Sequence, residues 1–107
     1  MEKTDRLLQE IVARIRGVCR PRQIILFGSR AREEAGPHSD YDVLVIQESD
    51  QPRYQRAGPL YCALKDVPAE VDVLVYTPNE VWEWSAVPQA FVTTAIREGK
   101  LLYESQE

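Results

Sequence analysis

The sequence is poor in cysteine and histidine, which narrows the chemistry available to it. Cys19 and Cys62 are its only two cysteines, and they lie far apart and match no metal-binding spacing. We therefore expect two reduced, buried thiols and no disulfide framework. The single histidine, His38, stands in a Pro-Ser loop, where a surface residue is a better interpretation than a catalytic base.

Long apolar runs and an excess of basic charge are missing as well. No stretch approaches the ~20 residues of a membrane helix, and the N-terminus has no signal-peptide pattern, so we expect a cytoplasmic protein without a membrane partner. The 13 basic residues are outnumbered by 17 acidic ones, which gives a net charge of −4 and a pI of about 5.0. General nucleic-acid binders carry a basic face, so direct nucleic-acid binding is not expected.

The 107 residues also contain no repeat, low-complexity segment or dividing linker. They are expected to form one domain, residues 1–107, which can bury roughly 60–70% of its unfolded surface. Apolar periodicity and turn residues predict the elements of this domain. Strands are expected at 23–27, 41–46, 70–76 and 101–103, and helices at 4–17, 29–35, 59–65, from 78 and at 88–99. Residues 47–58 are expected to form a loop, and Thr77 and Glu80 a capping box.

Two carboxylates and a Gly-Ser pair flank the connection between the first two strands. Gly28 and Ser29 stand where the first strand ends, and Asp40 and Asp42 where the next begins. Residues i and i+2 of a strand face the same side, so the two carboxylates should lie about 7 Å apart along it. Such a pair of hard oxygen ligands suits a divalent cation such as Mg²⁺.

The Gly-Ser turn adds a site for phosphate. Exposed amides at the start of the helix expected at 29–35 attract phosphate groups. Arg30 and Arg32 could touch the same oxygens, although a solvated helix face explains them equally well. A phosphate cradle beside a metal-binding carboxylate pair predicts a site for a nucleoside triphosphate.

A third carboxylate, Asp72, lies inside an otherwise apolar strand. An ionised carboxylate in a sheet core is costly unless it pairs with a cation. Sequential strands usually lie side by side, so Asp72 should converge on Asp40 and Asp42. Three carboxylates can hold two Mg²⁺ ions for an in-line phosphoryl displacement. Asp72 would bind only the ion that activates the acceptor hydroxyl, and would act as or position the general base.

These residues together resemble a known family. Gly28-Ser29, ten intervening residues and Asp40-Tyr41-Asp42, with Asp72 on a later strand, closely resemble the signature of the nucleotidyltransferase superfamily of DNA polymerase β. The short length is most similar to its minimal branch, the MNT-domain (MntA-like) antitoxins, and so is the ending from Phe91 onward. Many members read Gly-Ser-Arg-Ala-Arg-Gly, whereas Glu33 replaces the last glycine here, which concerns loop shape and not the metal ligands.

The resemblance implies a fold, an activity and a partner. The fold would be α/β (α+β), a small mixed sheet flanked by helices. The activity would be Mg²⁺-dependent transfer of AMP from ATP to a hydroxyl, with a tyrosine of a cognate HEPN-type RNase toxin as the implied acceptor. Catalysis and metal binding would fall to Asp40, Asp42 and Asp72, and nucleotide binding to Gly28, Ser29 and Arg30.

Two alternatives stay open at this point. Nucleotidyl transfer to a small molecule such as an aminoglycoside is one, although such enzymes usually carry a further helical domain for the acceptor. The other is a toxin-binding module that no longer turns over. The aromatic residues Trp82, Trp84, Phe91 and Tyr103 crowd the C-terminal third, where they fit either a core or a protein interface.

Overall fold

A four-stranded mixed sheet forms the centre of the molecule. The computed structural model describes residues 3–32 and 40–106. The strands are β1 (Gln23–Phe27), β2 (Tyr41–Ile46), β3 (Val71–Tyr76) and β4 (Lys100–Glu104), in the order β3-β2-β1-β4. The interior strand β1 pairs antiparallel with β2 and β4, and β2 pairs parallel with β3. The α+β class with a small mixed sheet is therefore confirmed.

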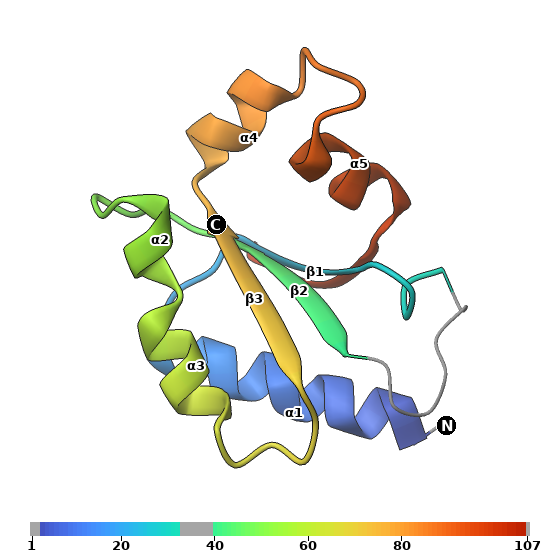
Figure 1. Cartoon of the computed structure of the whole chain (residues 1–107). Coiled ribbons are helices and arrows are strands. Elements are labelled where there is room, and N and C mark those ends of the chain that lie inside the picture. Colours follow the sequence, from blue (N-terminus) through green and yellow to red (C-terminus); the bar gives the residue numbers. More distant parts are fainter. Residues whose placement is uncertain (1–2, 33–39, 107) are drawn as a thin grey trace.

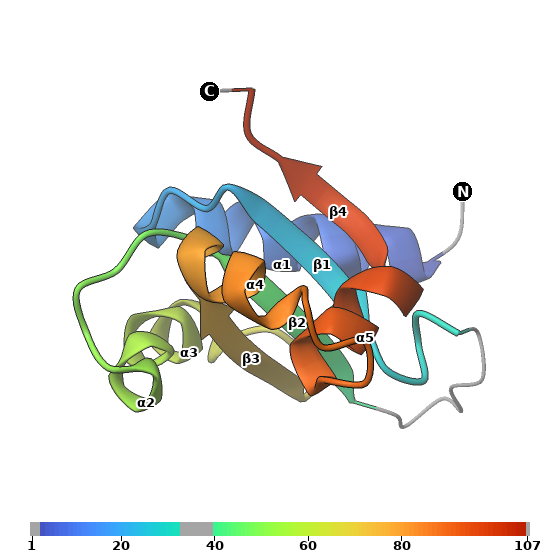
Figure 2. The same ribbon diagram turned by 90° about the horizontal axis from the view of Figure 1, so that it is seen from above.

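Helices cover both faces of this sheet. Helices α1 (Lys3–Val18) and α3 (Gly58–Leu64) lie on one face, and α4 (Pro78–Trp84) and α5 (Phe91–Glu98) on the other (Figures 1 and 2). Each face has its own apolar cluster, because side chains alternate along each strand. Val73 of β3 packs with Ile11 and Leu60 on the α1 side, and Leu44 of β2 packs with Val92 on the α5 side. Within the described ranges, no helix combines the length and apolar character needed to traverse a bilayer.

The structure corrects several sequence-based expectations. The loop expected at 47–58 contains a short helix, α2 (Arg53–Arg56), which is fixed by the tertiary contacts of Arg56 rather than by a local signal. The last helix begins at Phe91 instead of 88, after a turn in which the Ala90 amide donates to Val87. Only Cys19 is partly buried, and its pKa is raised by that burial, whereas Cys62 is exposed. Glu33 and His38 lie outside the described residues.

The connection from β2 to β3 decides which carboxylates meet. Parallel strands need a crossover, and here α2 and α3 supply it. The register of the parallel pair places Asp42 directly beside Asp72. The two residues are 30 positions apart in the chain, so only this pairing brings them together.

A nearly buried ion pair joins the crossover to α4. The side chain of Arg56 is 7% exposed and donates two hydrogen bonds to Glu80, at 2.6 and 3.0 Å. Glu80 also accepts from the Thr77 amide at 2.9 Å, which completes the capping box predicted for this helix. The hydrogen bonds from Arg56 are the main reason why the pKa of Glu80 falls to about 2.

The same crossover shields the outer edge of β3. Arg56 donates to the Val75 carbonyl at 3.2 Å, and the Tyr61 hydroxyl accepts from the Val73 amide at 2.9 Å. An open strand edge invites pairing with other chains. The side chains of α2 and α3 therefore occupy main-chain groups that would otherwise bond to a foreign strand.

The ion pair predicts an acid-sensitive stability. Because the pKa of Glu80 is lower in the folded than in the unfolded chain, its contribution is full above pH ~4.5 and is lost as the pH falls toward 2. Glu80→Gln should lower the free energy of unfolding at pH 7 by about 1–3 kcal/mol and flatten its loss below pH ~4.5. Urea unfolding across this pH range measures both effects.

The matched control is Glu83→Gln, an exposed carboxylate on the same helix. It should leave the stability and its pH dependence unchanged. If Glu80→Gln and wild type lose stability in parallel on acidification, the ion pair does not contribute as described.

Candidate active site

Gly28 allows β1 to end against the carboxylate of Asp42. Its φ angle is +76°, a conformation that side chains with a Cβ rarely adopt. A Cβ built at this position would also collide with the Asp42 side chain. Glycine is therefore required both by the backbone and by the close approach of the carboxylate.

Asp42 and Asp72 form a carboxylate pair at one end of the sheet. The pKa of Asp42 is raised, first by burial and then by repulsion from Asp72 and Asp40; a hydrogen bond between the carboxyl groups of Asp42 and Asp72 adds to it, and Arg32 opposes it. Asp42 is half-buried, whereas Asp40 and Asp72 are exposed. The expectation that Asp72 lies in the sheet core was wrong, because it sits at the solvent-facing start of β3.

The chemistry of the two carboxylates suits a divalent cation. Two adjacent carboxylates repel unless a proton or a cation lies between them, and their hard oxygens are the ligands that Mg²⁺ prefers. Among residues 3–32 and 40–106, no three Asp, Glu, His or Cys side chains already form a ready-made metal cluster. Asp42 and Asp72 are the pair that lines this end of the sheet, and the charge of Asp40 also acts on Asp42.

The carboxylate pair opens into a cavity of about 440 Å³, here called the aspartate pocket. Gly28, Asp42, Asp72 and Arg32 line its polar end. The rest of its lining consists of Phe27, Leu74, Phe91, Thr94, Ala95 and Glu98. Rings of Phe27 and Phe91 meet edge to face, with centroids 5.5 Å apart. The pocket therefore combines charged groups with an apolar wall large enough to hold a flat ring.

Most of the apolar wall of the aspartate pocket was not predicted from the sequence. Leu74 is an exception, because the period of a strand places it on the same face as Asp72, two positions earlier. The α5 residues had no such signal, because the packing of α5 over the end of β1 is tertiary.

The remaining predicted residues lie beside the pocket and not in its lining. Ser29 is half-buried in a turn, closed by hydrogen bonds from Ala31 and Arg32 to the Gly28 carbonyl at 3.1 and 3.2 Å. Arg30 stacks over the ring of Tyr41 at 3.8 Å, whereas Arg32 lines the cavity. Of the helix expected at 29–35, residues 29–32 form this turn, and the others lie outside the described residues.

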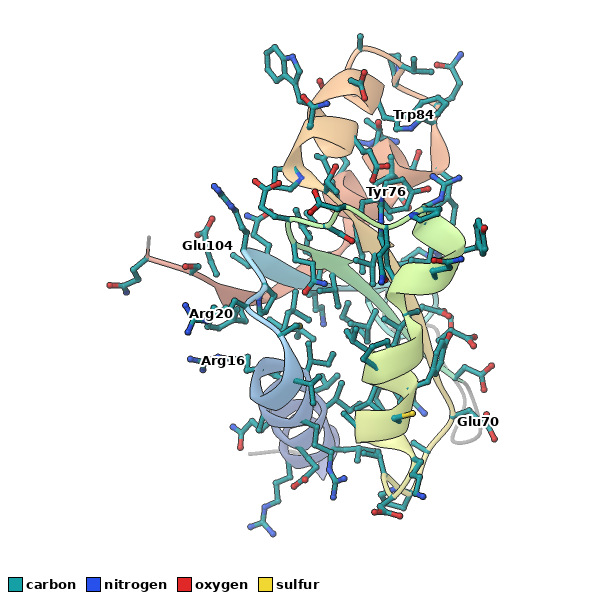
Figure 3. All side chains as sticks on the ribbon, turned by 90° about the vertical axis from the view of Figure 1, so that its left-hand side faces the viewer. Arg16, Arg20, Glu70, Tyr76, Trp84 and Glu104 are labelled. Carbon is teal, nitrogen blue, oxygen red and sulfur yellow. The ribbon has the colours of Figure 1, made fainter. Side chains whose placement is uncertain are left out.

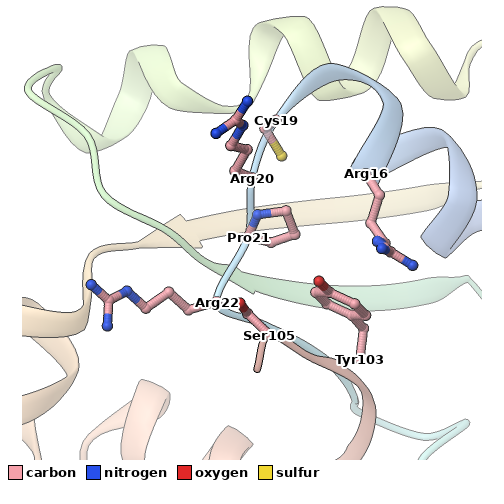
Figure 4. Close-up of a pocket in the computed structure, with 7 residues that line it drawn as sticks. All are labelled: Arg16, Cys19, Arg20, Pro21, Arg22, Tyr103 and Ser105. Atoms are coloured by element: carbon pink, nitrogen blue, oxygen red, sulfur yellow. The ribbon is translucent and has the colours of Figure 1, made fainter. Parts of the chain in front are cut away.

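A second cavity lies at the opposite end of the sheet, before β1 and after β4. It has a volume of about 380 Å³ and is lined by Arg16, Cys19, Arg20, Pro21, Arg22, Tyr103 and Ser105. Its three guanidinium groups point in different directions (Figure 4), and that of Arg16 stacks on Tyr103 at 4.2 Å. These groups do not converge on one point, whereas the aspartate pocket brings together two of the predicted carboxylates, so it is the better candidate.

Comparison with known families agrees with this choice of site. The family model described as polymerase beta, nucleotidyltransferase, matches residues 9–107. The chain belongs to this family. It is a minimal nucleotidyltransferase, and the mixed sheet with its two helical layers is the nucleotidyltransferase fold.

Solved structures show the same fold. A protein from Sulfolobus solfataricus assigned as a nucleotidyltransferase superposes with a TM-score of 0.69 at 19% identity, over 96% of this chain and 82% of that one. A toxin–antitoxin solved with AMP-PNP gives 0.55 at 25% identity, over 92% and 74%. A mutant of the MntA-HpeT toxin–antitoxin gives 0.59 at 20% identity, over 92% and 72%. No curated protein sequence matches.

Carboxylate repulsion in this nucleotidyltransferase predicts a stabilising mutation. Because the folded state raises the pKa of Asp42, its ionisation favours the unfolded chain, and stability is lost as the pH rises through the folded pKa. Asp42→Asn should raise the Tm at pH 7 by about 2–6 °C and give little gain at pH 3. Thermal denaturation of both proteins at the two pH values measures this.

Asp50→Asn removes an exposed loop carboxylate and serves as the control. It should leave the Tm unchanged at both pH values. A lower Tm for Asp42→Asn than for wild type at pH 7 would contradict the repulsion.

Proposed function

We propose that this nucleotidyltransferase transfers AMP from ATP to a hydroxyl of a partner protein, as the antitoxin of a toxin–antitoxin pair. The observation that carries the proposal is the Asp42–Asp72 pair facing Gly28 in the aspartate pocket. The likeness to a toxin–antitoxin solved with AMP-PNP supports both the nucleotide and the kind of partner.

Asp40, Asp42 and Asp72 are the residues proposed to hold Mg²⁺, with two ions in the full site. When bound, Mg²⁺ neutralises charge on the triphosphate and on the oxygens that attack and leave. The carboxylates themselves supply the matching negative charge, and the burial of Asp42 strengthens that interaction.

The triphosphate is proposed to enter along the polar end of the pocket. Gly28 leaves the backbone open to a phosphate, and the neighbouring Ser29 supplies a hydroxyl donor. Arg32 supplies a guanidinium at the cavity wall, while Arg30 supports the site through its stacking on Tyr41. The base would lie against Phe27 and Phe91, where an edge-to-face pair already offers an aromatic surface.

The transfer itself is an in-line displacement. The acceptor oxygen forms a bond to the α-phosphorus, the bond from that phosphorus to the bridging oxygen breaks, and pyrophosphate leaves. The hydroxyl proton passes to the carboxylate of Asp72 or through it to water. Asp72 suits this role because it is the exposed member of the pair, on the outermost strand.

The partner is proposed to be a HEPN-type RNase toxin that receives AMP on a tyrosine. Exposed aromatic residues on α4 and at the start of α5 support a protein partner: Trp82 is 75% exposed, Trp84 44% and Phe91 56%. The core alternative for these three side chains therefore does not hold. Large exposed aromatics are enriched at interface cores, and Phe91 also lines the aspartate pocket, so a docked partner would reach its mouth.

The decisive experiment is co-expression with the product of the neighbouring gene, which we expect to be a small helical protein. Intact mass after incubation with ATP and Mg²⁺ should show one added AMP on that protein. Asp40→Asn or Asp42→Asn should lower the rate at least ~10²-fold, because stabilisation of developing charge is lost. Asp50→Asn is the control and should transfer normally.

Other outcomes separate the alternatives. Co-purification without added mass supports a binding module, and transfer to an aminoglycoside but not to the protein supports a small-molecule enzyme. Near-normal transfer by either aspartate variant would refute the metal assignment.

Binding and chemistry can be separated by two further variants. Ser29→Ala should weaken Mg·ATP binding by about 1–2 kcal/mol, the scale of a hydrogen bond to a charged group. Asp72→Asn should keep Mg·ATP binding and abolish transfer, because it serves the acceptor. Calorimetry and transfer rates on both variants measure this, and the reverse pattern would show that the two roles are exchanged.

A further inference from the structure

Asp72 lines a further cavity, which lies beside the outer edge of β3. This cavity, here called the edge pocket, has a volume of about 470 Å³. It is lined by Tyr61, Leu64, Lys65, Val67, Ala69, Glu70, Val71 and Asp72. Among the described residues, Asp72 alone lines both this cavity and the aspartate pocket. The carboxylate proposed to receive the acceptor proton therefore lies between two separate binding spaces.

The main chain of β3 offers one open position in the edge pocket. The Tyr41 amide donates to the Glu70 carbonyl at 2.9 Å, and the parallel register then directs residues 70, 72, 74 and 76 toward β2. The amide and carbonyl groups of Val71, Val73 and Val75 consequently face outward. Tyr61 occupies those of Val73, and Arg56 the carbonyl of Val75.

Val71 differs from the other two outward positions. Within the described ranges, no helix side chain forms a hydrogen bond with its main chain, and the residue lines the edge pocket. Its amide and carbonyl form a donor and an acceptor on one residue, which one residue of an extended peptide can match. A sugar or an isolated amino acid lacks this paired main-chain geometry.

The side-chain period of a strand then sets the position of the acceptor. A peptide residue paired with Val71 would have, next in its chain, a residue opposite Asp72. Side chains opposite each other in neighbouring strands point to the same face. The hydroxyl of that residue would thus lie on the face of Asp72 that borders the aspartate pocket.

We propose that the edge pocket binds the acceptor as an extended, hydroxyl-bearing peptide segment that pairs with Val71. The inference rests on the proposed nucleotidyl transfer and adds the class and the entry side of the second substrate. Lys65 and Glu70 stand exposed at the pocket, and the Glu70 side chain points outward at the start of β3 (Figure 3). Both can bind charges that flank the hydroxyl residue.

Filling each cavity separately tests the proposal. Ala69→Phe adds bulk to the edge pocket, and Thr94→Phe adds it to the aspartate pocket. With short immobilised peptides centred on Tyr, Ser or Thr as acceptors, Ala69→Phe should raise the peptide KM at least ~10-fold and leave the Kd of Mg·ATP within ~2-fold. Thr94→Phe should weaken Mg·ATP binding instead. An unchanged peptide KM in a folded Ala69→Phe protein overturns the proposal.

Amide hydrogen exchange gives a readout that needs no transfer and no variant. Adding a binding peptide should slow exchange at Val71 and leave Val73, already bonded to Tyr61, as it was. Protection of Val71 without AMP transfer supports the acceptor site and refutes the proposed activity. Transfer without protection of Val71 refutes the acceptor site and supports the proposed activity. The acceptor site and the activity can therefore fail independently. Preference for kanamycin or for an RNA 3′ hydroxyl over every peptide overturns the acceptor class.

Discussion

The site depends on two carboxylates that the sheet holds side by side. Parallel pairing of β2 with β3 places Asp42 against Asp72. Gly28 lies against the Asp42 side chain, because a Cβ at this position would collide with it. Burial first, and then repulsion from Asp72 and Asp40, raise the pKa of Asp42. A fold that spends stability to keep like charges together is typical of a functional site, where strain is tolerated for what it binds.

The rest of β3 shows how that cost is confined to one end of the strand. Near its C-terminal end, Arg56 and Glu80 form a compensated ion pair that also bonds the strand edge and the cap of α4. At its N-terminal end, Asp72 and the main chain of Val71 face open cavities. One strand thus has one end stabilised by an ion pair and another end open to two cavities.

Helices α4 and α5, on the other face of the sheet, also differ in how much of their surface they bury. Val92 and Ala95 of α5 are buried against the sheet, whereas α4 has no fully buried residue and exposes Trp82 and Trp84. Phe91 belongs to both regions, since it contacts Phe27 and remains 56% exposed. Exposed aromatic surface of this kind is typical of the places where proteins bind one another.

Local patterns were enough to determine the strands, the capping box at Thr77 and the Gly28-to-Asp42 motif, because each depends on neighbours in the chain. Tertiary structure alone decided the rest. The anchoring of α2 by Arg56 and the placement of Arg30 on Tyr41 instead of in the pocket both join distant residues. The sequence predicted that Asp72 converges on Asp42, but the register that sets the two side by side came from the structure. Side-chain direction and strand register are set by packing between elements, and a single sequence does not encode them in any short pattern.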